Sequence, residues 1–401
     1  MKPNYTLLAL LCIGLSVPLA YYFVKRRSPD DGATVRIATF NVALNRAEAG
    51  ALLQELEGGK CEPAKQLASL VQTVRPDVLL LNEVDRDPAA RAAEVFRREY
   101  LGVSQGGRDA IEYPFVFCGA VNTGVPSGQD LDGDGRTDGP ADAYGYGRFP
   151  GQYGMVLLSR YPILEDQIRT FQKLRWSQMP DAQRPKGYYS DEAWQQLRLS
   201  SKSHWDVPIG IGRQQDGVVL HALCSHPTPP SFDGAEDRNG CRNHDEIRFW
   251  GDYLTPGKGD WIVDDGGTSG GLAEKEDFVV LGDLNCDPRD GDSRRQALLD
   301  LLGHDRVQDF EPRGDGGAEQ KLLQFGRNMQ HQGDPALDTG DFGDGVGDND
   351  EGPGNLRVDY VLPSRSLQVA RGAVLWPKSY EPALKLCEAS DHRMVWIDVR
   401  L

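Results

Sequence analysis

The stretch Pro76–Val84, PDVLLLNEV, carries four apolar residues in a row and then an amide and a carboxylate. Its proline ends the segment 62–74, whose apolar residues recur at helical spacing. A short apolar run that follows such a stop signal is typical of a strand buried on both faces. We therefore expect a helix at 62–74 and a strand at 77–81. Glu83 then follows the strand, where a side chain can reach the rim of a sheet.

Similar apolar runs recur along the chain and alternate with helical segments. Further strands are expected at 35–41, 154–159, 218–224, 278–281, 358–362 and 394–399, and further helices at 244–254 and 293–302. The longest connections, rich in glycine, aspartate and proline, are expected at 119–151, 256–271 and 314–354. Because no linker divides the chain into two self-sufficient halves, we expect one α/β domain over residues 35–401.

Polar side chains gather where these expected strands end. The residues at these ends are Asn41, Glu83, His226, Asp283, Asn285, Asp359, Asp391 and His392. A single aspartate after a strand is usually a turn residue, but six strand ends that all carry capable groups favour a shared site. Carboxylate and amide oxygens without cysteine suit magnesium, manganese or calcium rather than zinc. With histidines beside them, they predict metal-assisted hydrolysis of a phosphate ester.

The motifs resemble the endonuclease/exonuclease/phosphatase superfamily, which has the deoxyribonuclease I-like fold. The matching stretches, in the family order, are IATFN at 37–41, PDVLLLNEV at 76–84, GMVLLSRYPI at 154–163, GDLN at 282–285, RVDY at 357–360 and SDH at 390–392. They span nearly all of the chain after its first residues. The resemblance implies a four-layer α/β sandwich of two packed mixed sheets flanked by helices, with long decorated loops and a site at one rim.

The resemblance also implies a metal site. Glu83, helped by Asn41, resembles the principal ligand of a divalent ion, and Asp391 is a further candidate ligand. One or two Mg²⁺ or Mn²⁺ ions are the expected cofactor. Just upstream of the GMVLLS strand, Arg148 and Tyr153 stand where relatives often place side chains that contact phosphate or line the site. Both are also compatible with ordinary loop residues.

The remaining residues resemble the groups that act on the phosphate. Asp283 resembles the residue that orients or deprotonates the attacking water, and Asn285 the residue that holds a phosphate oxygen. His392 resembles the histidine that binds the scissile phosphate, with Asp359 as the carboxylate that keeps it oriented and protonated. His226 resembles a second family histidine and is a candidate general acid.

One loop follows the first nine positions of a calcium-binding loop of the EF-hand type. Its carboxylates are Asp130, Asp132, Asp134 and Asp138, with glycine at the sixth position. The twelfth position is Ala141 rather than glutamate, and no clear helical pattern flanks the loop. Structural Ca²⁺ and a solvated acidic turn both remain open. The aspartate-rich run at 334–351 lacks this spacing and is expected to be a solvated loop.

The first residues form a separate unit. Residues 6–24 are almost uninterrupted apolar sequence, about as long as a membrane-spanning helix, and Lys25, Arg26 and Arg27 follow. We expect residues 1–27 to be a signal anchor, with a cleaved signal peptide as the alternative, and 28–34 to be a linker. The basic residues favour a cytoplasmic domain. Six further cysteines, an even number, fit disulfides, such as a bridge between Cys224 and Cys241, and so favour an extracytoplasmic, exported domain. Six reduced, mostly buried thiols are the alternative.

The net charge of the chain favours one class of substrate over another. Forty-four basic against sixty acidic side chains give a formal net charge of −16, so the chain lacks the overall basic charge that drives non-specific binding to nucleic acid. A small phosphorylated molecule or a phospholipid is the favoured substrate class, and no obligate protein partner is expected. A secreted or membrane-anchored nuclease is the alternative. A catalytically inactive, calcium-holding binding module is the second alternative.

Overall fold

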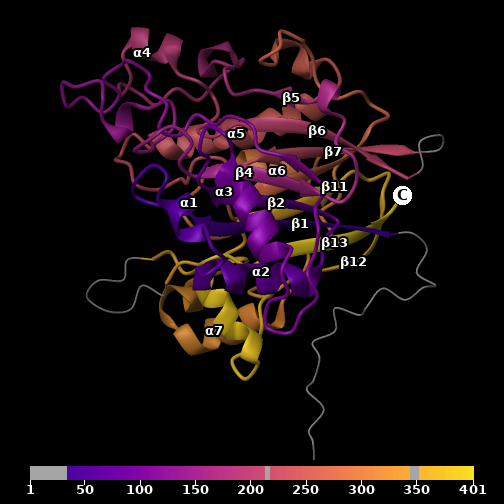
Figure 1. The fold of residues 1–401 in the computed structure, drawn as a ribbon. Helices are drawn as coiled ribbons and strands as arrows, with labels where there is room; N and C mark the ends of the chain where they lie inside the picture. The colour runs from indigo at the N-terminus through magenta and orange to yellow at the C-terminus, as the bar shows by residue number, and fades with distance from the viewer. Residues whose placement is uncertain (1–33, 213–216, 344–351) are drawn as a thin grey trace, which may run out of the picture. The chain divides into compact units, whose positions relative to one another are not determined.

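Two mixed β-sheets form the centre of the molecule (Figure 1). The computed structural model describes residues 34–212, 217–343 and 352–401, and their contacts belong to one compact unit, Ala33–Leu401. The sandwich of two mixed sheets flanked by helices that the sequence predicted is confirmed.

The first sheet has six strands in the order β12-β13-β1-β2-β4-β3. Only β1 and β2 run parallel among its neighbouring strands, within the described residues. The strands are β1 (Thr34–Leu44), β2 (Val78–Val84), β3 (Phe115–Phe117), β4 (Gly154–Ser159), β12 (Gln368–Val374) and β13 (Val395–Arg400). The central position of β1 and β2 places the strands with the expected Asn41 and Glu83 in the middle of this sheet.

The second sheet has five strands in the order β11-β8-β7-β6-β5, and here β7 and β8 are the parallel pair. Its strands are β5 (Arg169–Thr170), β6 (His204–Ile211), β7 (Val218–Ser225), β8 (Asp277–Asp283) and β11 (Asp359–Pro363). A separate ribbon joins β9 (Gly340–Asp341) to β10 (Asn355–Leu356). β7 and β8 carry the chain to His226 and Asp283, so the second sheet supplies the other half of the predicted site.

Alternating side chains along the strands build the layers. On β1, Ile37 faces the second sheet, whereas Ala38 and Phe40 face a cluster formed with the helices. On β7 the same alternation sends Ala222 towards the first sheet and Leu223 towards the opposite helices. Successive side chains on a strand point to opposite faces, so each sheet needs a cover on both sides.

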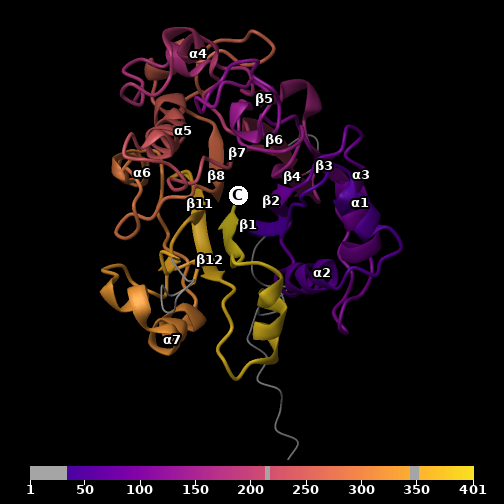
Figure 2. The same ribbon diagram turned by 90° about the vertical axis from the view of Figure 1, so that its left-hand side faces the viewer.

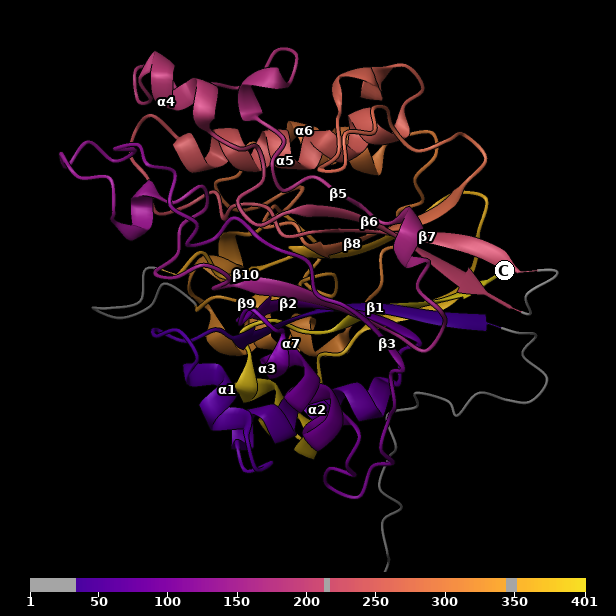
Figure 3. The same cartoon turned by 45° about the horizontal axis from the view of Figure 1, so that its top comes forward.

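Helices provide the outer covers. Figures 2 and 3 show α1, α2 and α3 on the outer face of the first sheet, and α5 and α6 on the outer face of the second. The α-helices are α1 (Ala51–Leu56), α2 (Glu62–Val74), α3 (Arg91–Val95), α4 (Asp191–Gln196), α5 (Arg238–Leu254), α6 (Gln296–Leu302) and α7 (Asp315–Gln324). A π-helical turn, η1 (Phe96–Leu101), continues α3. The 3₁₀ turns are η2 (Pro140–Asp142), η3 (Glu165–Gln167), η4 (Trp176–Gln178), η5 (Lys258–Trp261), η6 (Gly326–Gln330) and η7 (Pro382–Ala389).

Two sequence expectations change. Helix α5 begins at Arg238 rather than at His244, so His244 lies inside the helix and does not open it. The expected disulfides are absent, because all six cysteines of the described residues are free thiols. Cys224 packs in the layer between the sheets, whereas Cys241 packs in the outer helical layer, so the second sheet separates them.

The expected membrane segment at 6–24 and most of the acidic run at 334–351 lie outside the described residues. Among the helices that the structure describes, none is both long and apolar enough to cross a bilayer.

Candidate active site

Residues from both sheets meet at one rim of the sandwich. Strand β1 contacts β8 and β11 across the layer between the sheets. Asn41 lies near the carboxyl end of β1, and Asp283 is the last residue of β8. Because β11 is antiparallel to β8, its first residue, Asp359, pairs directly with Asp283. His392 stands just before β13, the antiparallel neighbour of β1, and so reaches the same rim.

The carboxylate of Asp283 is the centre of this group. Its Oδ2 accepts a hydrogen bond of 3.0 Å from Asn41 Nδ2 and lies 3.3 Å from His226 Nε2 and 3.6 Å from His392 Nε2. The carboxylate is 1% exposed. Burial alone would raise the pKa of Asp283, but the charge of His392 and the hydrogen bonds from His226 and Asn41 hold that pKa well below its usual range. Asp283 is therefore an ionised carboxylate at neutral pH.

His392 lies between two carboxylates. Its Nδ1 is 2.8 Å from Asp359 Oδ2, and its Nε2 faces Asp283. Burial lowers the pKa of His392, but the charges of Asp359 and Asp283 outweigh burial and raise it to about 10. Burial raises the pKa of Asp359 to about 6, which still leaves this carboxylate ionised at neutral pH. The ring is thus an imidazolium, which donates from Nδ1 to Asp359 and carries a second proton on Nε2.

The backbone around His392 is fixed on both sides. Ser390 Oγ accepts a hydrogen bond of 3.0 Å from the His392 amide and donates one of 2.7 Å to the Asn41 carbonyl. The edge of Phe342 packs against the imidazole with ring centroids 5.1 Å apart. These contacts hold the ring in one orientation beside Asn41.

His226 joins the group from the end of β7. The ring is 2% exposed, and its Nδ1 has no hydrogen-bond partner among the described residues. Burial and the nearby charge of Lys202 lower the pKa of His226, so the ring is neutral at neutral pH. A neutral ring with its proton on Nε2 donates to Asp283, and it is poorly suited to the general-acid role that the sequence suggested.

Gly282 and Asn285 shape the backbone around Asp283. Gly282 has φ +147, and a Cβ there would lie 1.9 Å from the Ser225 carbonyl oxygen of β7, so no larger residue fits. Asn285 has a left-handed backbone with φ +51. Its backbone N–H donates to Asp283 Oδ1 at 2.9 Å and its Nδ2 donates to the Pro227 carbonyl at 3.1 Å.

A β-bulge sets the direction of Glu83. The pairing of β2 shifts register between Asn82 and Val84, so Glu83 is the extra residue, and its φ is +62. A bulge turns a side chain out of the regular alternation of a strand, and left-handed residues other than glycine concentrate at functional sites. Glu83 is half-buried and accepts a hydrogen bond of 2.8 Å from Asn45 Nδ2. Its charge raises the pKa of His226, so the two side chains are electrostatically coupled.

Three other predicted residues lie at the edge of the group. Tyr153 is half-buried with φ +54, and burial together with the charge of Glu83 raises its pKa. Arg148 is exposed and acts electrostatically on Tyr153. Asp391 is exposed, and its negative charge contributes to the raised pKa of His392. The structure therefore places them beside the centre rather than in it.

The acidic loop brings three of its four predicted carboxylates together. One oxygen from each of Asp130, Asp132 and Asp134 lies within 4.8 Å of the others, and all three side chains are exposed. Asp138 instead pairs with Arg136 at 2.9 Å. The buried Asp142 accepts hydrogen bonds from the backbone of this loop. Calcium binding at the loop stays a prediction.

Comparison with models of protein families shows to which family the chain belongs. The model of the endonuclease/exonuclease/phosphatase family matches residues 38–392. The chain belongs to this family. Members of the family hydrolyse phosphate esters, and the chain is a hydrolase of this kind.

Several solved structures are similar to this family member. An endonuclease/exonuclease/phosphatase from Beutenbergia cavernae DSM 12333 has a TM-score of 0.49 and 19% identity over 92% of this chain and 72% of the other. A family protein from Leptotrichia buccalis C-1013-b has a TM-score of 0.45 and 14% identity over 92% and 100%. Sphingomyelinase C from Streptomyces griseocarneus has a TM-score of 0.46 and 14% identity over 91% and 99%. No protein with a curated description matches the chain in sequence.

Enzymes of this family generally use divalent metal ions, and the oxygen donors at the rim fit such an ion. One ligand atom from each of Asp283, Asp359 and His392 lies within 4.8 Å of the others. A protonated imidazole has no lone pair to give, however, so His392 is a poor metal ligand while both of its nitrogens carry protons. The half-buried carboxylate of Glu83 acts electrostatically on His226 and stays a candidate ligand.

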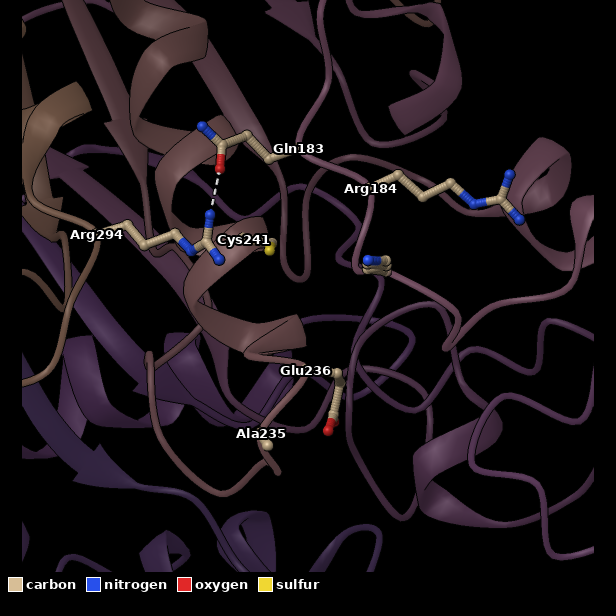
Figure 4. Close-up of a pocket in the computed structure, with 7 residues that line it drawn as sticks. Gln183, Arg184, Ala235, Glu236, Cys241 and Arg294 are labelled. Carbon is tan, nitrogen blue, oxygen red and sulfur yellow. Dashed lines mark hydrogen bonds between the residues drawn. The ribbon is translucent and has the colours of Figure 1, made fainter.

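Figure 4 shows a cavity of about 490 Å³ with a different lining. It is lined by Gln183, Arg184, Lys186, Ala235, Glu236, Cys241 and Arg294. Arg294 donates to Gln183 at 2.6 Å, and Arg184 pairs with Asp191 at 2.7 Å. None of the predicted site residues lines this cavity, and two of its cations already have partners.

Sequence reasoning missed two buried charges near the rim, Lys202 and Glu246. Lys202 is 6% exposed and Glu246 is 1% exposed. Lys202 lies in a serine-rich run without a motif, and Glu246 lies on an ordinary helical segment, so nothing local marks either residue. Their positions depend on the packing of α5 against the segment before β6.

Proposed function

We propose that this chain is a divalent-metal-dependent phosphoesterase that hydrolyses a phosphate mono- or diester by in-line attack of water. The observation that carries the proposal is the group around Asp283. An ionised carboxylate and an imidazolium lie side by side at a rim, each held by hydrogen bonds to neighbouring strands. This arrangement offers an acceptor for the hydrogens of water and a cation for a phosphoryl oxygen.

Asp283 positions the water. Its lowered pKa makes it a weak base, so it is better suited to accept a hydrogen bond from water than to remove a proton early in the reaction. Asn41 and His226 donate to the same carboxylate oxygen, which fixes its orientation. Asn285 lies at the end of the same turn, and its amide can donate to a phosphate oxygen.

His392 binds the phosphate. The contacts of its Nε2 with Asn41 and Asp283 are long, at 3.4 and 3.6 Å, so its proton can reach a phosphate oxygen. Asp359 keeps the ring protonated at neutral pH through the bond to Nδ1. The imidazolium offsets the negative charge of the phosphate without a proton transfer.

Glu83, assisted by Asn41 and with Asp391 nearby, would hold one or two Mg²⁺ or Mn²⁺ ions. When bound, the ion would supply positive charge to the phosphate and its leaving oxygen. Arg148 and Tyr153 would contact the part of the substrate that extends past Glu83.

The net charge of −16 supports a small phosphorylated or lipid-linked substrate rather than nucleic acid. A domain tethered by the N-terminal segment would meet such a substrate at a membrane, and we expect no obligate protein partner.

The test is hydrolysis of a substrate panel by the full-length chain with magnesium, manganese, calcium or EDTA. The panel holds p-nitrophenyl phosphate, bis-p-nitrophenyl phosphate, inositol phosphates, sphingomyelin, RNA, and single- and double-stranded DNA. We expect metal-dependent turnover that D283N and H392A abolish, with a small or lipid-linked substrate preferred. Preference for DNA or RNA would instead establish a nuclease. A folded protein that hydrolyses nothing with any metal would refute the proposal.

A further inference from the structure

Lys202 is a buried lysine without a counterion. It is 6% exposed and lies in the buried run Ser200–Ser203 that leads into β6. In the part of the chain that the structure describes, its ammonium forms no ion pair, and the hydrogen bond that Nζ donates to the Pro227 carbonyl is long, at 3.5 Å. Lysine is almost never fully buried unless it is paired, so this position needs a physical reason.

The carboxylate that acts most strongly on Lys202 serves a different purpose. Glu246 Oε1 accepts hydrogen bonds from the Ser201 amide at 2.6 Å and from its hydroxyl at 3.0 Å, and Oε2 accepts one of 2.6 Å from the Thr228 amide. Glu246 therefore ties the segment before β6 to the segment after His226. It fixes the backbone on both sides of Lys202 but does not pair with the ammonium.

Two opposing effects act on the charge of the Lys202 ammonium. Burial lowers the pKa of Lys202, and the charges of Glu246, Glu83 and Asp283 act against burial. Two of these three carboxylates belong to the site described above. The carboxylates of that site thus act electrostatically on the ammonium, but among the described residues none of them forms an ion pair with it.

The contact with Pro227 shows where the ammonium lies. The same carbonyl oxygen accepts from Lys202 Nζ and from Asn285 Nδ2. Two donors that share one acceptor lie side by side, next to His226. An oxygen of a ligand at this place could accept one hydrogen bond from each donor.

We propose that Lys202 is a further catalytic residue, whose ammonium contacts a non-bridging oxygen of the scissile phosphate beside Asn285. The inference rests on the proposed function of the same site. When phosphate binds, Nζ exchanges its long bond to Pro227 for a bond to a charged oxygen. Negative charge spreads over the non-bridging oxygens in phosphoryl transfer, and a fixed cation in a water-excluded site stabilises that charge strongly.

The test compares K202M, which keeps the length of the side chain and removes its charge, with K65M as the matched control. Lys65 is a partly exposed lysine of α2 that pairs with Glu62 at 2.6 Å. On the full-length protein we would measure inorganic phosphate binding by calorimetry, with and without magnesium. The melting temperature and kcat on the best substrate of the panel would be measured beside it.

For K202M we expect phosphate to bind about 10-fold more weakly or worse, as for one lost hydrogen bond to a charged group. We expect kcat to fall by about 100-fold or more, as when a donor to a transition-state oxyanion is removed. The melting temperature should stay equal or rise, because the variant no longer buries an unpaired charge. K65M should match the wild type in both binding and kcat.

Each contrary result has a definite meaning. Unchanged phosphate affinity and kcat in K202M would overturn the role of Lys202 and leave the phosphoesterase proposal standing. A K202M protein that fails to fold would also overturn it, because the charge would then serve the fold. Phosphate binding that depends on Lys202 without turnover of any substrate would refute the hydrolysis and keep the phosphate contact. A wild-type protein that binds no phosphate would refute the contact.

Discussion

Replacing Asp359 by asparagine should lower kcat/KM at pH 8 but leave it almost unchanged at pH 6. Asp359 Oδ2 lies 2.8 Å from His392 Nδ1, and its charge does most to raise the pKa of that ring. D359N keeps the shape of the side chain and removes the charge. Burial then acts on the imidazole against the charges of Asp283 and the exposed Asp391 alone, so we expect the pKa of His392 to fall back towards its ordinary range.

The size of the effect follows from the two pKa values. With a pKa of about 10, the imidazolium of the wild type exceeds the neutral ring about 100-fold at pH 8. With an ordinary pKa near 6.5, the neutral ring would exceed the imidazolium about 30-fold at that pH. If only the imidazolium binds phosphate productively, D359N should lose about 30-fold in kcat/KM at pH 8 and little at pH 6.

The assay is kcat/KM from pH 5.5 to 9.5, with the His392 resonances followed by NMR over the same range. D206N is the matched control, because Asp206 pairs with His221 Nδ1 at 2.6 Å in another histidine–aspartate pair. The control should keep the wild-type pH profile. An equal loss of activity at pH 6 and pH 8 in D359N, or a His392 pKa that stays near 10, would refute the reasoning.

The same pair affects stability. Because the folded-state pKa of His392 is raised above its unfolded value, its stabilising contribution is complete below pH ~6.5 and is lost as pH rises to about 10. The free energy of unfolding in urea should therefore fall across this range in the wild type and fall less in D359N. Equal slopes in both proteins would contradict this linkage.

Three further perturbations test other parts of the molecule. E83Q should abolish the rise in melting temperature that Mg²⁺ or Mn²⁺ produces in the wild type, and a retained rise would place the ion elsewhere. The double variant D130N/D134N should lose calcium binding measured by calorimetry while kcat stays unchanged, and a wild type that binds no calcium there would leave the loop a solvated turn. G282A should lower the free energy of unfolding by about 3 kcal/mol or more, because its Cβ would lie 1.9 Å from the Ser225 carbonyl oxygen. Urea denaturation measures this loss, and a G282A protein as stable as the wild type would show that the backbone can relax.

The strands were largely predictable because burial on both faces leaves unbroken apolar runs. Helix 62–74 and strand 154–159 have the predicted bounds. Strand β6 was missed, since Pro208 stands in its middle and proline normally argues against a central strand. The structure accommodates Pro208 because β5 is only two residues long and does not pair with that part of β6.

The predicted site residues were found because they follow those same strands. Their protonation was not predictable, since the raised pKa of His392 and the lowered pKa of His226 depend on burial and on neighbours distant in sequence. The disulfide expected between Cys224 and Cys241 was wrong for a related reason. Spacing along the chain does not reveal that a sheet separates the two thiols.

The layer between the two sheets also sets a mechanical tolerance for the site. Asn41 lies on the first sheet and His392 just before its strand β13, whereas Asp283 and Asp359 belong to the second sheet. A slip of one sheet past the other by a single residue step, about 3.3 Å, would exceed the length of the bonds that join them. A shift between the two sheets would therefore abolish catalysis before the strands themselves unfold. Turnover therefore gauges how firmly the two halves of the sandwich are docked.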